Sequence, residues 1–136
     1  MRLARSSTLA VLLIAALPAC DCGGDIGSSS RNVVKIESPA EGDSVFASGE
    51  ITFRATGENL GGVDLMSLRI GEGADIEALK ECDPDEAGIT VACEHTFKVK
   101  DFGAKIVDQS ILLTAWLRDA QGQTAEASVR VNVKPI

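Results

Sequence analysis

The sequence predicts an all-β domain, an antiparallel sandwich of about seven strands, and three observations lead to that fold class. Short runs in which apolar and polar residues alternate recur at regular intervals from Asn32 onward. Turn residues separate these runs, and no segment shows a long stretch of helical periodicity. A chain of 136 residues has room for one domain with a single hydrophobic core.

Six runs have the alternation expected of strands. In chain order they are VVKIESP (33–39), EITFRATG (50–57), LMSLRIG (65–71), HTFKVKDFG (95–103), SILLTAWLRD (110–119) and TAEASVRVNV (124–133). The segment 72–88 differs, because Ile76, Leu79 and Cys82 are spaced as on a helix. We expect one or two helical turns there, lying across a sheet edge between the middle strands.

The last two runs predict a hairpin with a defined register. Facing Leu117 with Ala125 also pairs residue 115 with 127, 113 with 129 and 111 with 131, and all of these residues are apolar. This register leaves the loop 120–122, which ends in Gly122 at the position where such hairpins need a positive φ. The alternation of apolar residues and the glycine of the loop therefore predict the same hairpin register.

The same register predicts a candidate binding face on the outside of the sheet. Its members point away from the core and include a tryptophan near arginine, a combination typical of protein contacts. They are Leu112, Trp116, Arg118 and Arg130. The alternative is that the helical turn near Leu79, or the loop between the later cysteines, covers Trp116.

The first twenty residues, MRLARSSTLAVLLIAALPAC, have the order of an export signal. Arg2 and Arg5 precede an apolar stretch at 8–17, and small residues come before Cys20. The apolar stretch is far shorter than the roughly 20 residues that a transmembrane helix needs. We therefore expect cleavage rather than a permanent transmembrane anchor.

The residues Leu17 to Cys20, LPAC, resemble the lipobox of bacterial lipoproteins. The resemblance implies that residues 1–19 are a signal peptide and that Cys20 carries lipid, which would hold the protein at a membrane of the cell envelope. The alternative is an ordinary signal peptide cut nearby. Asp21 occupies the position after the lipidated cysteine, where aspartate favours the inner membrane in the enterobacterial lipoproteins that this segment resembles.

Residues 21–32 are polar and rich in glycine and serine, which predicts a flexible linker. We therefore divide the chain into a signal peptide (1–19), a lipidated cysteine with its linker (20–32) and a folded domain (33–136). Removing Arg2 and Arg5 from the 13 basic residues leaves 11 against 20 acidic ones, a formal charge of −9. Such a charge disfavours nucleic acid as a partner.

Cys82 and Cys93 flank one short acidic loop, and an exported protein meets an oxidising compartment. We expect a disulfide between them, with two buried free thiols as the alternative. Cys22 is left over, and it is either a bystander or pairs between molecules.

The opening VKIESPAEGDSVFASGEITFRATG and the last hairpin resemble the bacterial immunoglobulin-like and fibronectin III-like modules of cell-envelope proteins. The shared features are a P..G..V turn before the second strand and a D..GQ turn, here Asp119 and Gly122, before the last strand. The resemblance covers about Val33 to Pro135 and implies an immunoglobulin-like β-sandwich. The chain has no tyrosine, and its one tryptophan falls late in the sequence.

Three patterns resemble catalytic or ligand sites, and each is incomplete. Gly71 and Gly73 follow a strand, but the third position of a dinucleotide loop is Ile76. His95 is the only histidine and lacks the close ligand spacing of a zinc site. The calcium candidates of the acidic loop, which fit a solvated loop better, are Asp83, Asp85 and Glu86.

We therefore expect no cofactor, no bound metal and no catalytic activity. The chain is interpreted as a lipid-anchored envelope protein whose domain binds another envelope protein, as an adhesion or assembly module. The alternatives are a structural accessory of an envelope complex and, last, an enzyme or metal carrier. Ligand and oligomeric state are left open by the sequence.

Overall fold

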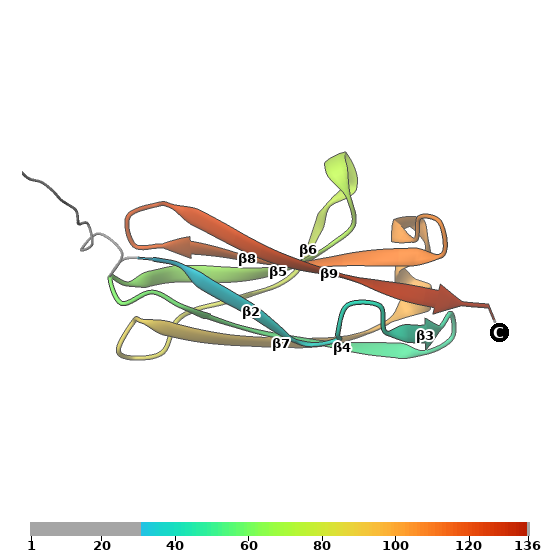
Figure 1. Cartoon of the computed structure of the whole chain (residues 1–136), viewed down its shortest axis with the longest axis horizontal. Coiled ribbons are helices and arrows are strands. Elements are labelled where there is room, and N and C mark those ends of the chain that lie inside the picture. Colours follow the sequence, from blue (N-terminus) through green and yellow to red (C-terminus); the bar gives the residue numbers. More distant parts are fainter. Residues whose placement is uncertain (1–30, 136) are drawn as a thin grey trace, which may run out of the picture. The chain divides into compact units, whose positions relative to one another are not determined.

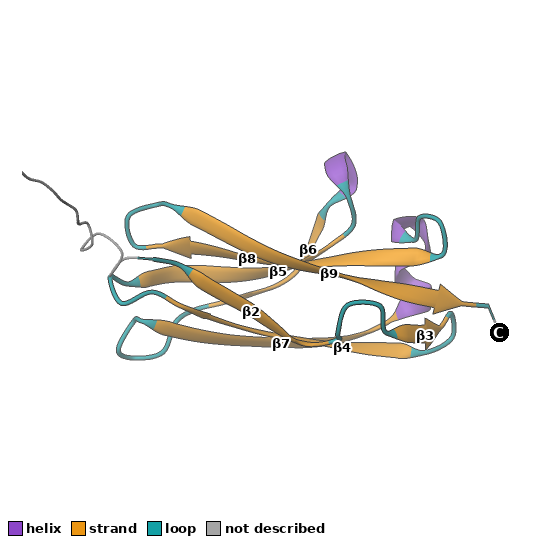
Figure 2. Ribbon diagram, viewed as in Figure 1, coloured by secondary structure: helices purple, strands orange, loops and turns teal. Residues whose placement is uncertain are grey.

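The computed structural model describes residues 31–135, and strands make up most of that range (Figure 2). Two short 3₁₀ turns lie in the connections. The elements in order are β2 (Val33–Ser38), β3 (Ser44–Phe46), β4 (Glu50–Glu58), β5 (Val63–Ile70), η1 (Gly73–Asp75), β6 (Glu77–Cys82), β7 (Thr90–Lys98), η2 (Val99–Lys105), β8 (Ser110–Asp119) and β9 (Thr124–Lys134). No helix in this range is long and apolar enough to cross a bilayer.

The strands form two layers (Figure 1). One sheet has the order β2-β4-β7, and the other has the order β3-β9-β8-β5-β6. The chain changes sheets after β2, β3, β4, β6 and β7, which gives the Greek-key path of an immunoglobulin-like sandwich. The predicted fold class is confirmed, with eight strands in the described range and one parallel pair, β3 with β9.

The core lies between the sheets, because every second side chain of the central strands points inward. On β4 the buried apolar residues are Ile51, Phe53 and Ala55, and on β8 all four apolar residues used to predict the hairpin register are fully buried. Gly57 continues the inward series of β4, where a Cβ would come within 2.9 Å of Met66 and 3.0 Å of Leu117. Glycine therefore fits here without displacing these neighbouring side-chain methyl groups, which any larger residue would have to push aside.

The β8–β9 hairpin has the predicted register. Leu117 faces Ala125, and the pairing continues without a shift to Ile111 and Val131. Gly122 has φ of 87°, as the three-residue loop requires.

The short helical turn expected in 72–88 is present, but the helical spacing read from Ile76, Leu79 and Cys82 is wrong. A single 3₁₀ turn occupies Gly73–Asp75, but residues 77–82 form strand β6, and Ile76 is exposed rather than packed on a helical face. The residues of β6, EALKEC, favour a helix in isolation. Pairing with β5, and the bond made by Cys82, hold them extended, so tertiary contacts override local propensity.

Candidate functional site

The outer face of the five-stranded sheet carries the predicted binding residues. In the register of β8 with its neighbours, Trp116 lies between Ser67 of β5 and Glu126 of β9. Leu112 is on the same face of β8 and is paired with Arg130 of β9. The strands therefore bring the predicted residues to one face; whether that face binds a partner is a proposal made below.

Trp116 is half-buried, and an arginine rather than a loop lies over its ring. The guanidinium carbon of Arg69, on β5, is 4.2 Å from the ring centroid, and that of Arg118 is 5.7 Å from it. Both distances are within the range of cation–π attraction. Leu79, which was considered as a cover for Trp116, packs against the core instead.

A hydrogen bond to the neighbouring Ser67 also holds the Arg69 side chain in place. Its Nε donates a hydrogen bond of 3.2 Å to the Oγ of Ser67, a side chain with no exposed surface. Sequence reasoning missed Arg69. The alternation of Leu65, Ser67 and Arg69 signals an outward side chain, but its position beside Trp116 depends on the β5–β8 register, which pairs strands distant in sequence.

The other two arginines of this face are ion-paired. Arg118 contacts Asp64 Oδ2 at 2.6 Å through Nη2 and at 2.7 Å through Nε. Arg130 Nη1 donates to Glu72 Oε2 at 2.8 Å. This hydrogen bond lowers the pKa of Glu72 and raises the pKa of Arg130.

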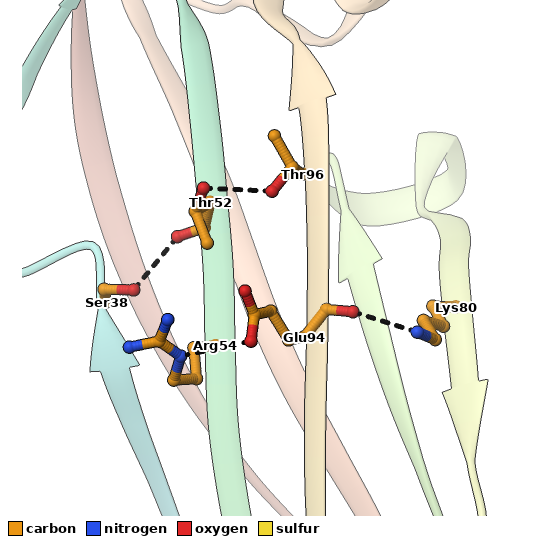
Figure 3. A network of polar contacts seen from close by, with 6 residues as sticks. All are labelled: Ser38, Thr52, Arg54, Lys80, Glu94 and Thr96. Carbon is orange, nitrogen blue, oxygen red and sulfur yellow. Dashed lines mark hydrogen bonds and ion pairs between the residues drawn. The ribbon is translucent and has the colours of Figure 1, made fainter.

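The outer face of the three-stranded sheet is different in character, as Figure 3 shows. The hydroxyls of Thr52 and Thr96 are hydrogen-bonded at 3.0 Å, and Arg54 is ion-paired with Glu94 at 3.4 Å. These cross-strand pairs join β4 to β7 and leave no aromatic side chain on the outer face of either strand. We therefore do not count this face as a candidate contact surface.

The predicted disulfide between Cys82 and Cys93 is present, with a Cα–Cα distance of 5.7 Å. It joins β6 to β7 and so links the edges of the two sheets. Nearby, Lys80 Nζ donates to the carbonyl oxygen of Glu94 at 3.1 Å, a second tie across the same edge (Figure 3). The disulfide and the Lys80 bond therefore join the two sheets at the edge where the chain crosses from β6 to β7.

A buried carboxylate, which sequence reasoning treated only as a turn residue, organises the end of the sandwich where β2 begins. Asp119 Oδ1 accepts hydrogen bonds from the backbone amides of Gln121 at 2.9 Å and Gln123 at 2.8 Å. Its Oδ2 accepts from the side-chain amides of Asn32 at 3.2 Å and Asn59 at 3.4 Å. Three segments that are far apart in the sequence are therefore joined through one side chain.

The candidate ligand residues His95 and Asp85 make structural contacts. The ring of His95 stacks on Phe97 with centroids 6.3 Å apart. Asp85 accepts hydrogen bonds from Thr90 Oγ1 at 2.7 Å and from the amide of Gly88 at 3.0 Å, and the first of these bonds is the main cause of its lowered pKa. In residues 31–135, no three His, Cys, Asp or Glu side chains are grouped so that they could hold a metal ion.

The predictions for the N-terminal part of the chain stay predictions. Cys20, Asp21, Cys22 and the linker up to residue 30 lie outside the described residues.

Comparison with known proteins adds structural likenesses of low identity. No family model and no curated protein matches the chain. Among solved structures, the fibronectin(III)-like modules of Clostridium thermocellum CbhA match with 19% identity and a TM-score of 0.49, over 75% of this chain and 96% of that chain. A β-glucosidase from Listeria innocua matches with 10% identity and a TM-score of 0.43, over 79% of this chain and 17% of that one.

Murine CRIg matches with 8% identity and a TM-score of 0.37, over 78% of this chain and 98% of that chain. Because each of these scores is below 0.5, the fold is assigned from the strand order and register of this chain itself.

Proposed function

We propose that this protein is a lipid-anchored component of a bacterial cell envelope, and that its sandwich is a non-catalytic module that binds another envelope protein. The observation that carries the binding part is Trp116, half-buried on an outer sheet face and packed beside Arg69 and Arg118. Tryptophan and arginine contribute most to the energy of protein interfaces, because they bury large surfaces while keeping polar contacts.

The anchoring part rests on the N-terminal sequence. Two or three acyl chains on one cysteine hold a protein durably at a bilayer, whereas one chain binds only reversibly. With Cys20 lipidated, a dozen linker residues would place the domain about 20 Å from its anchor. The binding face would then be within reach of proteins in or near the same membrane.

The first experiment tests the anchor. Expressed in a bacterium as the full chain, the protein is expected in the membrane fraction, and Cys20→Ser is expected to move it to the soluble fraction. Cys22→Ser serves as the matched control and leaves it membrane-bound. An intact mass that corresponds to an unmodified chain beginning at another residue would contradict lipidation.

The second experiment tests the binding face. Envelope proteins that cross-link to the wild-type protein in cells are compared with those that cross-link to Trp116→Ala and to Thr96→Ala, a control on the opposite outer face. We expect Trp116→Ala to reduce a specific cross-linked species at least fivefold and Thr96→Ala to retain it. If Trp116→Ala retains all cross-linked species, the proposed binding face is wrong.

A further inference from the structure

Among the arginines of the Trp116 face, Arg69 is the one without a carboxylate partner in the part of the chain that the structure describes. Its guanidinium group lies over the indole ring at 4.2 Å, and its Nε is bonded to the buried hydroxyl of Ser67. A guanidinium group has five N–H donors, so this arrangement uses the single Nε donor and leaves the donors of both terminal nitrogens. A long side chain that is already held in place loses less entropy when it binds.

The absence of a carboxylate partner distinguishes Arg69 from comparable residues. Of the four arginines on the described strands, Arg54, Arg118 and Arg130 are each paired with a carboxylate. No described Asp or Glu lies within 4.0 Å of the Arg69 guanidinium. The described part of the protein therefore holds the Arg69 guanidinium in place but gives it no carboxylate partner.

We propose that Arg69 receives an Asp or Glu carboxylate of the partner protein, with Trp116 as the apolar surface beside it. This inference rests on the proposed function and adds the chemistry of the partner. The two terminal nitrogens match the two oxygens of a carboxylate, which gives a bidentate, charge-assisted pair. An ammonium group at this position would have the charge but not the fork geometry.

The surrounding charges favour a single carboxylate over a polyanion. The expected mature chain has a net charge of −9, which repels nucleic acid and anionic lipid surfaces. On the binding face itself, Glu126 lies directly opposite Trp116. A partner with one acidic side chain can reach Arg69 without approaching many of these negative groups, whereas an extended anion cannot.

The experiment uses the mature chain with Cys20→Ser and two peptides, acetyl-Gly-Glu-Gly-amide and acetyl-Gly-Gln-Gly-amide, at low ionic strength. The sole tryptophan of the chain makes its fluorescence a specific signal of this face. We expect saturable binding of the Glu peptide with a dissociation constant on the order of millimolar, and binding of the Gln peptide about tenfold weaker. Inorganic phosphate is the competing probe and is expected to bind more weakly than the Glu peptide.

Single-residue variants test whether the carboxylate binds at Arg69. Arg69→Gln and Arg69→Lys are both expected to weaken binding of the Glu peptide about tenfold, while Arg54→Gln, on the opposite face, leaves it unchanged. Glu126→Gln is expected to strengthen it, because a like charge is removed. Circular dichroism checks that each variant is folded.

Equal binding of the two peptides, no binding of either, unaltered binding by Arg69→Gln, or tighter binding of phosphate would each overturn the carboxylate assignment. The cross-linking experiment of the proposed function does not depend on any of these peptide-binding results. Failure of this inference is therefore distinguishable from failure of the proposed function.

Discussion

The buried carboxylate of Asp119 should contribute a large share of the stability of the domain. The side chain is 1% exposed and accepts four hydrogen bonds, two from backbone amides of the β8–β9 loop and two from asparagine side chains. Asp119→Ala removes one acceptor from each of these four donors, while Asn59 Nδ2 keeps its bond of 2.9 Å to Asn32 Oδ1. The loop amides belong to exposed residues and can be rehydrated, whereas the Asn59 side chain is fully buried.

The magnitude follows from these two classes of donor. A hydrogen bond to a charged group contributes about 1.5–3 kcal/mol, and rehydration of exposed donors recovers part of the loss. We therefore expect Asp119→Ala to lower the free energy of unfolding by about 3 kcal/mol. For a domain of this size, that corresponds to a fall in Tm of roughly 12 °C. Asp119→Asn keeps one acceptor oxygen and should cost about half as much.

Urea unfolding followed by Trp116 fluorescence measures the effect, since a stability change shifts the midpoint while the slope stays constant. Glu58→Gln is the matched control, because that carboxylate is exposed at the same end of the sandwich; it should change stability by less than about 0.5 kcal/mol. A loss below about 1 kcal/mol for Asp119→Ala would refute the argument. Water would then replace the carboxylate at no cost.

Three further predictions test the rest of the structure. Replacing Cys82 and Cys93 together with alanine should destabilise the domain by about 3 kcal/mol, the loop-closure term for a separation of 11 residues, and non-reducing peptide mapping should recover the two cysteines in one linked fragment. Free alkylation of both thiols in the unreduced native protein would contradict this. Trp116→Ala should cost less than about 2 kcal/mol, because its ring is only half-buried, whereas a loss of 3–5 kcal/mol would place it in the core. Thr90→Val should raise the pKa of Asp85 toward its ordinary value, as measured by NMR titration; since folding lowers this pKa, the stabilisation that it reflects is present at neutral pH and is lost as the pH falls through the folded-state value.

The sequence was most informative where local pattern and turn chemistry coincide. The β8–β9 hairpin could be predicted to the residue, because its two strands are adjacent in the chain and Gly122 defines the loop. Export chemistry and spacing were likewise enough to pair Cys82 with Cys93. In both cases the interacting residues are separated by a short loop.

Prediction failed where a contact depends on distant segments. The residues of β6 favour a helix, and only pairing with β5 makes them a strand. The stacking of Arg69 on Trp116 requires the β5–β8 register, which spans residues 63–119. Asp119 was recognised as a turn residue, but its role also requires Asn59, which lies 60 residues away.

The residues that hold the sandwich together are separate from those proposed to bind. The inter-sheet disulfide and the Lys80 bond close one edge, while Asp119 joins the loops at one end. The side chains of the Trp116 face contact one another across strands, and none of these contacts joins the two sheets. Substitutions at Arg69 or Trp116 should therefore change binding at small cost in stability, because the core beneath them is complete without their side chains. This separation makes binding variants of the face interpretable, since loss of a partner would not be a consequence of unfolding.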